Sequence, residues 1–319
     1  MMMRRLAFSL LAAVFLVAGG AAAQEGRGGG VGPQQAGGEL LIFNAWVRPT
    51  APQPSEGAEA APEGMSGMDQ DAGRTSAAYM LIQNTTTVGY TLVSVSTSFS
   101  AESQFHETVM NGDLMQMRQL ETGMAIPAGA FAELTPGGYH AMLLGVTQDI
   151  TADSAVALRL TFRGDDGSTL EKMVAALVTD SLPELGLIAA VDAYALPAPQ
   201  EVTPGLAVAA TPEAADMALA LYLTIINLRA PTVNLIGARL DFAGAVEVRE
   251  SYMQEGIITS RAIPFAPVPV QARLLLQPNG YFLRAADLAA EGLPPAGSAF
   301  LATLLFDEGT ALIVPFLVR

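Results

Sequence analysis

The stretch that decides the fold is Val156-Ala157-Leu158-Arg159-Leu160-Thr161-Phe162. Its large apolar residues stand at every second position, with smaller or polar residues between them. Successive side chains of a β-strand point to opposite faces of the sheet, so this spacing predicts a strand with one buried face. Phe300, Ala302, Leu304 and Phe306 repeat the pattern further along the chain. The two stretches are therefore predicted to be the same strand in two copies of one domain.

Three further matches flank these strands in the same order and at a nearly constant offset. Residues 44–49 match 192–197, residues 78–84 match 221–227, and residues 136–139 match 278–281. The period is near 143 residues, and a period of this length indicates two whole domains rather than a solenoid. Turn signals such as Asn111-Gly112 and Asp165-Asp166-Gly167 separate short apolar runs, which is typical of an antiparallel sandwich.

The sequence therefore predicts an all-β protein of two tandem antiparallel β-sandwich domains. The first copy covers residues 40–180 and the second copy residues 185–319. One short helix is expected at residues 211–220. Two segments rich in Gly, Pro and polar residues, 24–39 and 51–73, are predicted to be a flexible leader and a flexible insertion.

The first 23 residues have the pattern of a secretory signal peptide. Arg4 and Arg5 precede an apolar run over residues 6–18, and Ala21-Ala22-Ala23 forms a small-residue cleavage pattern. The run is too short to span a bilayer, although an uncleaved anchor is the alternative. We therefore expect a protein that is exported, periplasmic or otherwise extracytoplasmic, and soluble after cleavage. No cysteine follows the cleavage pattern, so no lipid attachment is expected.

Charge and cysteine content exclude several functions. The formal net charge is −15, and Lys172 is the single lysine, which argues against binding to nucleic acid or anionic lipid. The chain has no cysteine. A blue-copper site, a cysteine nucleophile and a thiol-exchange pair are therefore all impossible.

The residues that suggest chemistry are two histidines and their methionine neighbours. His106 and His140 are the only histidines, and both lie in the first copy. His140 and Met142 stand two apart on a predicted strand, as do Met115 and Met117, so each pair shares one face. Imidazoles together with thioethers suit Cu(I). From spacing alone the alternative stays open, because methionine on a strand is more often core filling.

At these residues the sequence resembles the periplasmic copper chaperones called PCu(A)C. Their motif is H-x10-M-x21-H-x-M, with its end in a P-G-G-Y-H-x-M-L run. Here ten residues separate His106 from Met117, twenty-two separate Met117 from His140, and the run Pro136-Gly137-Gly138-Tyr139-His140-Ala141-Met142-Leu143 is present. The one additional residue fits the loop at 122–133. The resemblance covers residues 40–178.

The resemblance implies a cupredoxin-like fold and a Cu(I) site of His106, Met117, His140 and Met142. It also implies delivery of copper to an apo copper protein, namely the Cu(A) centre of a cytochrome oxidase subunit or an assembly factor of that enzyme, near the membrane surface. At the matching positions the second copy has Arg249, Ser260, Phe282 and Arg284. We therefore expect one Cu(I) per chain and a second copy that binds no metal.

Two other functions stay open at this point. The first is copper sequestration, in which Met65 and Met68 of the 51–73 insertion add ligands beside the secondary candidate Met115. The second is a non-metal interaction module, which applies if the second copy carries the active surface. An enzyme is not expected, because no further histidine is left for a second metal centre or an oxygen-activating site.

Overall fold

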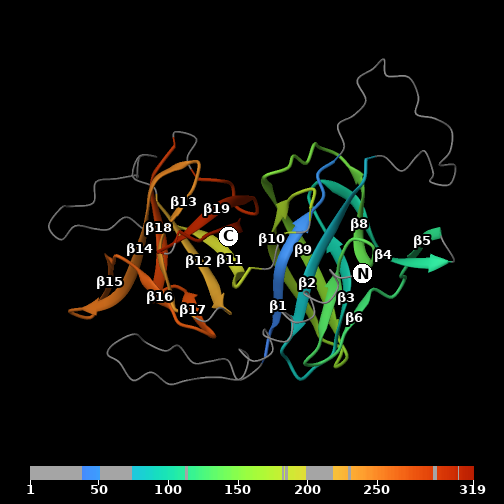
Figure 1. Cartoon of the computed structure of the whole chain (residues 1–319), viewed down its shortest axis with the longest axis horizontal. Coiled ribbons are helices and arrows are strands. Elements are labelled where there is room, and N and C mark those ends of the chain that lie inside the picture. Colours follow the sequence, from blue (N-terminus) through green and yellow to red (C-terminus); the bar gives the residue numbers. More distant parts are fainter. Residues whose placement is uncertain are drawn as a thin grey trace, which may run out of the picture. The chain divides into compact units, whose positions relative to one another are not determined.

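The structure is a computed structural model of the 319-residue chain. It describes residues 38–50, 74–111, 114–181, 183, 186–198, 218–228, 231–289, 293–307 and 309–319. The expected signal peptide, nearly all of the leader and the insertion at 51–73 lie outside these residues. The described residues form an all-β protein of two tandem domains, which confirms the predicted fold class (Figure 1).

The chain divides into two compact units, one formed by Gly37–Glu184 and the other including Leu185–Arg319. The strands of the first copy are β1 (Leu40–Val47), β2 (Ser76–Asn84), β3 (Tyr90–Ser96), β4 (Ser100–Asn111), β5 (Leu114–Gln119), β6 (Met124–Ile126), β7 (Phe131–Leu134), β8 (Tyr139–Val146), β9 (Ser154–Gly164) and β10 (Thr169–Val178). Those of the second copy are β11 (Ile188–Ala198), β12 (Ala218–Asn227), β13 (Val233–Arg239), β14 (Ala243–Gln254), β15 (Ile257–Ala262), β16 (Ala266–Val268), β17 (Ala272–Leu276), β18 (Tyr281–Leu288), β19 (Ala299–Phe306) and β20 (Ala311–Val318).

The two copies have the same topology, strand for strand. Over the described residues, the first forms a ten-stranded sheet in the order β5-β4-β8-β7-β2-β1-β10-β9-β3-β6. The second has the order β15-β14-β18-β17-β12-β11-β20-β19-β13-β16. Most neighbours are antiparallel, but β1 pairs with β10 and β7 with β8 in parallel, and the second copy has the same two parallel pairings, β11 with β20 and β17 with β18. The internal repeat seen in the sequence is therefore a repeat of the whole domain.

The core of the first copy lies on the face of β9 that the sequence predicts. Leu158, Leu160 and Phe162 are completely buried, whereas Arg159 between them is exposed. Burial of each such side chain contributes about 2 kcal/mol to folding. In the second copy Ala302, Leu304 and Phe306 of β19 are buried in the same way.

A β-bulge in β1 explains the match between residues 44–49 and 192–197. Asn44 has a φ of 45°, and the register of β1 against β2 shifts between Phe43 and Trp46. Asn and Asp adopt this left-handed conformation more easily than most residues, and Asp192 of β11 does the same with a φ of 52°. Leu40 and Ile42 face the core before the bulge, and Ala45 and Val47 face it afterwards. The bulge thereby turns the side chain of Trp46 to the opposite face of the sheet.

The predicted helix at 211–220 is wrong where the structure describes it. Residues 218–220 belong to β12 and pair with residues 196–198 of β11, while 211–217 lie outside the described residues. Ala218, Leu219 and Ala220 are all buried. Strand pairing and burial therefore outweigh the helix preference of alanine. Within the described ranges, no helix is long and apolar enough to cross a membrane.

Candidate metal centre

Three neighbouring strands bring the candidate ligands together. In the register of β4 and β8, His106 lies directly opposite His140, and Gln104 lies opposite Met142. In the register of β4 and β5, Thr108 lies opposite Met117. Side chains two apart on a strand share a face, and so do those directly opposite on neighbouring strands. His106, Met117, His140 and Met142 therefore all lie on one face of the sheet, at the alternate positions 104, 106 and 108 of β4.

This face points away from the core. Phe105, Ala141 and Leu143 alternate with the candidate ligands along β4 and β8, and all three belong to the main hydrophobic core. We call the opposite side, which carries the candidate ligands together with Trp46 and Tyr79, the outer face. A bound ion on the outer face would be open to a partner protein without disturbance of the core.

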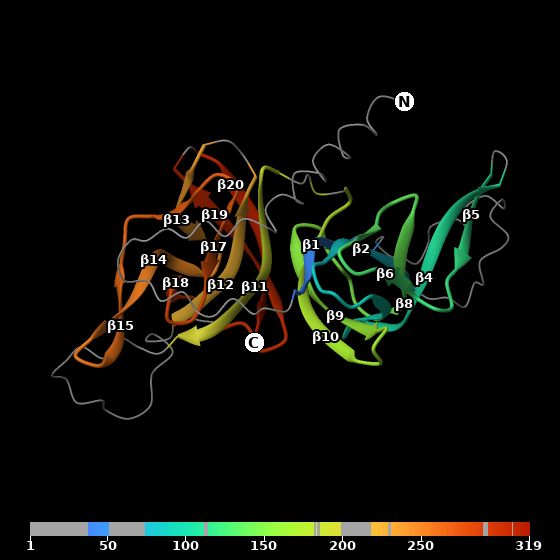
Figure 2. The same cartoon turned by 90° about the horizontal axis from the view of Figure 1, so that it is seen from below.

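Exposure differs among the four candidate side chains. His140 is 5% exposed, His106 and Met142 are partly buried, and Met117 is 49% exposed. Met117 lies on β5, which within the described residues pairs only with β4 at the edge of the sheet. Figure 2 shows β4 and β5 as a hairpin that projects from its domain. The candidate site therefore has a buried side at His140 and an open side at Met117.

The two imidazoles are held close together and have opposite hydrogen-bond arrangements. Their ring centroids are 5.7 Å apart, and the ring planes meet at 74°. His140 Nδ1 donates a hydrogen bond to the carbonyl oxygen of Gly138 at 3.1 Å. His106 Nε2 lies 3.2 Å from Gln104 Oε1, and His106 Nδ1 is buried with no hydrogen-bond partner. A metal ion would satisfy this buried nitrogen.

Electrostatics favour neutral imidazole at His106. Burial lowers the pKa of His106 below its ordinary value, and the proximity of His140 lowers it further. A neutral ring keeps a lone pair for a metal, whereas a protonated ring has none. At the next rung, hydrogen bonds from Arg118 and Tyr139 lower the pKa of the Glu107 carboxyl. The Arg118–Glu107 ion pair, at 2.6 Å, joins β5 to β4 beside the site.

An aromatic column supports His140 from the side of β1 and β2. The Trp46 and Tyr79 rings stack with centroids 4.3 Å apart, and the Tyr79 and His140 centroids are 6.3 Å apart. Trp46, Ala77 and Tyr79 form a small buried cluster on the outer face, against which Met142 packs. Sequence reasoning used Trp46 and Tyr79 only as repeat landmarks. In the second copy the matching residues are Tyr194 and Tyr222. This match was the signal in the sequence that both copies have an aromatic residue at each of the two positions.

The secondary candidates are less well defined. Met115 lies in β5, two residues before Met117, and its backbone pairs with that of Met110. Nothing is described of the Met115 side chain, and Met65 and Met68 lie outside the described residues. Over the described part of the chain, no group of three or more His, Cys, Asp or Glu side chains is arranged to hold a metal. The candidate donors that the described strands place on the outer face are imidazole and thioether groups.

The second copy keeps the backbone of the site and replaces its side chains. Arg249 lies opposite Phe282, Arg284 opposite Glu247, and Ser260 opposite Ser251, in the registers of His106, Met142 and Met117. Arg249 is 6% exposed. Its guanidinium donates to Glu247 Oε2 at 2.7 Å and to the hydroxyl and carbonyl oxygens of Ser260 at 3.1 and 3.2 Å. A fixed cation thus occupies the place that corresponds to the candidate metal centre.

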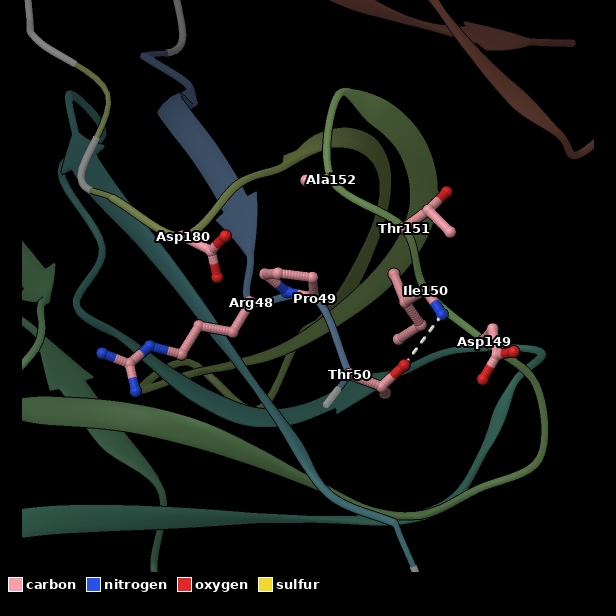
Figure 3. A pocket seen from close by; sticks show the side chains of 8 residues that line it. All are labelled: Arg48, Pro49, Thr50, Asp149, Ile150, Thr151, Ala152 and Asp180. Carbon is pink, nitrogen blue, oxygen red and sulfur yellow. Dashed lines mark hydrogen bonds between the residues drawn. The ribbon is translucent and has the colours of Figure 1, made fainter. Parts of the chain in front are cut away.

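A cavity of about 690 Å³ lies elsewhere in the first copy (Figure 3). Residues 48–50, residues 149–152 and Asp180 line it. Thr50 Oγ1 accepts hydrogen bonds from the Ile150 amide at 3.0 Å and from Arg74 at 2.8 Å. Arg74 also forms an ion pair with Asp149. No histidine or methionine lines this cavity, so it is separate from the candidate metal centre.

The fold and the outer face together define a class of protein, a tandem β-domain protein with two histidines and two methionines on one face of its first domain. The family model described as LpqE-like, "Putative lipoprotein LpqE-like", matches residues 40–174 and again residues 188–318. The chain belongs to this LpqE-like family and contains two copies of its PCuAC-related domain, which confirms the predicted relationship. The description of the family as lipoproteins indicates an extracytoplasmic location.

Individual proteins and solved structures also resemble this chain. The chain is 34% identical over 93 residues to "Putative lipoprotein Lxx21020" from Leifsonia xyli subsp. xyli. That match spans 29% of this chain and 55% of the relative's own length. Similar solved structures include the copper-bound PCuAC domain from PmoF2, with 19% identity and a TM-score of 0.30 over 46% of this chain and 97% of that one. They also include the Cu(I) form of DR1885 from Deinococcus radiodurans, with 22% identity and a TM-score of 0.28 over 44% of this chain and 80% of that one.

Proposed function

We propose that this protein is an extracytoplasmic Cu(I) carrier and not an enzyme. It binds one Cu(I) through His106, Met117, His140 and Met142 and transfers the ion to an apo copper protein, namely the Cu(A) centre of cytochrome oxidase. The observation that carries the proposal is the placement of the four residues on one face of three neighbouring strands, where His106 Nδ1 is buried without a hydrogen-bond partner.

The chemistry of the donor set selects the ion. Thioether sulfur is a soft ligand that suits Cu(I), and imidazole suits several transition metals. Zn(II) prefers nitrogen, thiolate and carboxylate ligands, and two of the four donors here are thioethers. We therefore expect strong preference for Cu(I) over Zn(II), and no intense blue band with Cu(II), because the chain contains no cysteine.

The difference in exposure between His140 and Met117 suits transfer of the ion by ligand exchange. The ion stays Cu(I) throughout, so no electron donor or acceptor is needed. An incoming ligand of the partner reaches the open side first and replaces Met117, which is half exposed on an edge strand. His140 is nearly buried beside the aromatic column and holds the ion until further partner ligands arrive.

A Cu(I) titration in competition with a chromophoric Cu(I) chelator tests the proposal. We expect one tightly bound Cu(I) per chain, with nitrogen and sulfur scatterers in its X-ray absorption spectrum. Zn(II) should fail to displace it at comparable concentration. Addition of an apo Cu(A) domain should then remove the copper from the carrier. Failure to bind Cu(I), or equal affinity for Zn(II), would exclude this ligand set.

Sequestration is distinguished from delivery by the same experiment. A storage protein would keep its copper in the presence of the apo Cu(A) domain and would take up more than one ion per chain. The methionines that would add capacity, Met65 and Met68, lie outside the described residues, so their part in copper binding stays a prediction.

A further inference from the structure

Gln104 connects the candidate metal centre to the rest of β4. It lies two residues before His106 and therefore on the same outer face. Its side-chain Nε2 donates a hydrogen bond to Glu102 Oε1 at 2.9 Å, and its Oε1 lies 3.2 Å from His106 Nε2. An ionised carboxylate only accepts hydrogen bonds, so Glu102 fixes the amide with its oxygen toward His106.

This contact determines which nitrogen of His106 carries the hydrogen. The amide oxygen of Gln104 can only accept, so His106 Nε2 must be the donor, and in the neutral ring Nδ1 keeps its lone pair. At His140 the arrangement is reversed, because the Gly138 carbonyl accepts from Nδ1 and leaves the lone pair on Nε2. The other tautomer of His106 would place two lone pairs against each other at Gln104 and a hydrogen on buried Nδ1 with no acceptor.

We infer that Gln104 is a positioning residue for copper binding: it holds His106 in the tautomer with hydrogen on Nε2, so that His106 binds the ion through Nδ1 and His140 binds it through Nε2. The inference rests on the proposed function for its copper part. Its tautomer part concerns the metal-free protein and is tested separately.

The second copy has an equivalent contact, in which a carboxylate and a guanidinium replace the amide and the imidazole. Glu247 lies opposite Arg284, as Gln104 lies opposite Met142, and it accepts a hydrogen bond from Arg249 two residues later at 2.7 Å. In both copies the residue at this register therefore orients the central side chain of the outer face. A carboxylate suits a permanent cation such as Arg249, whereas a neutral amide orients an imidazole without favouring its protonated form.

NMR of the imidazole nitrogens in the metal-free protein, at about pH 8, above the ordinary titration range of histidine, tests the tautomers. We expect hydrogen on Nε2 of His106 and on Nδ1 of His140. In Gln104→Leu the His106 ring should become a mixture of tautomers while the His140 ring stays as it was. Gln104→Glu should restore the Nε2–H form, because a carboxylate also accepts. Hydrogen on Nδ1 of His106 in the unsubstituted protein would overturn the inference.

The copper part uses the same variants and one matched control. Loss of a hydrogen-bond partner behind a metal ligand typically costs about 10- to 100-fold in affinity, so Gln104→Leu should weaken Cu(I) binding by that factor and Gln104→Glu should recover most of it. Gln119→Leu changes the exposed cross-strand neighbour of His106 on β5 and should leave affinity unchanged. Unchanged affinity in Gln104→Leu, with full binding by the unsubstituted protein, would overturn the positioning role but not the carrier function. If the unsubstituted protein binds no Cu(I), the carrier function fails, and the copper part of this inference fails with it.

Discussion

At the scale of single residues, Met80 and Met117 show that methionine has two different roles in the first copy. Met80 is 2% exposed in the core, and Met117 is 49% exposed on the outer face. Met117→Ala should change the free energy of unfolding by less than about 0.5 kcal/mol and weaken Cu(I) binding by orders of magnitude. Met80→Ala should cost about 2 to 5 kcal/mol of stability and leave the affinity of the folded protein intact. Denaturant unfolding and chelator competition measure both quantities, and a folded Met117→Ala variant that still binds copper normally would refute the ligand assignment.

The proximity of the two histidines gives a pH prediction. Burial and the neighbouring His140 lower the pKa of His106, so its NMR titration midpoint in the metal-free protein should lie below about 6.5, the ordinary value. The unfolded chain then takes up this proton at a higher pH than the folded one. The contribution of neutral His106 to stability is therefore complete above the ordinary pKa and is lost as the pH falls through the lowered pKa.

A control for this titration comes from the second copy. Phe282 occupies the position of His140 there, so His140→Phe keeps an aromatic ring at this position and removes the neighbouring charge. The midpoint of His106 should move upward in this variant. A midpoint above the ordinary value in the unsubstituted protein would show that burial does not govern this group.

The four candidate ligands could be proposed from spacing and resemblance, but their surroundings could not. His140 and Met142 are near in sequence, so their common face follows from strand geometry alone. The direct pairing of His106 with His140 depends on the register of β4 against β8, which are separated by three other strands along the chain. Local spacing contains no information about such a register. Gln104 was missed for the same reason, since an amide on a strand face has significance only when its neighbour is known.

At the scale of elements, the end of β2 is fixed by one buried asparagine. Asn84 is completely buried, and its Nδ2 lies within hydrogen-bond distance of the carbonyl oxygens of Val88, Ile126 and Pro127. Asn84→Leu would remove these three contacts together with the Thr86 bonds to Asn84 Oδ1, and should destabilise the first copy by about 3 kcal/mol. Fluorescence of Trp46, the single tryptophan, follows the unfolding of this copy alone.

The second copy offers the matched comparison for this element. Asn227 of β12 is also completely buried and donates to Pro231 and Val268. Asn227→Leu should therefore leave the Trp46 transition where it is while it destabilises the second copy. Equal shifts of the Trp46 transition in both variants would show that the two copies unfold together.

Strands were predicted where one face is buried and the alternation is regular, as in β9 and β19. The bulge at Asn44 was not predicted, although Asn44 and Asp192 match, because the reversal of faces becomes visible only when β1 is paired with β2. The short helix failed at residues 218–220 because alanine is compatible with both structures. Burial between neighbouring strands decided the outcome there, and burial is a property of the whole domain.

At the scale of the whole molecule, the second copy should be convertible into a copper site. The substitutions Arg249→His, Ser260→Met, Phe282→His and Arg284→Met restore the four ligands on an equivalent backbone, and Glu247→Gln restores the positioning amide. We expect the five-fold variant to bind two Cu(I) per chain instead of one, measured by chelator competition. Phe282→His with Arg284→Met alone should still bind one, because Arg249 keeps its place. If the variant with all five substitutions folds but binds a single ion, the outer faces of the two copies differ in more than these residues.

The exposure of Met117 also decides how the protein responds to oxidants. A thioether in contact with solvent is converted to the sulfoxide, a polar group that is no longer a soft sulfur ligand. Met117 is open to this reaction, whereas Met142 is partly covered by Trp46 and Tyr79. A peroxide burst would therefore disable copper uptake first at the edge strand, leave the fold intact, and be reversed by methionine sulfoxide reductase. Bound Cu(I) uses one of the two lone pairs of the sulfur and withdraws electron density from it, so we expect the loaded carrier to be less sensitive than the empty one.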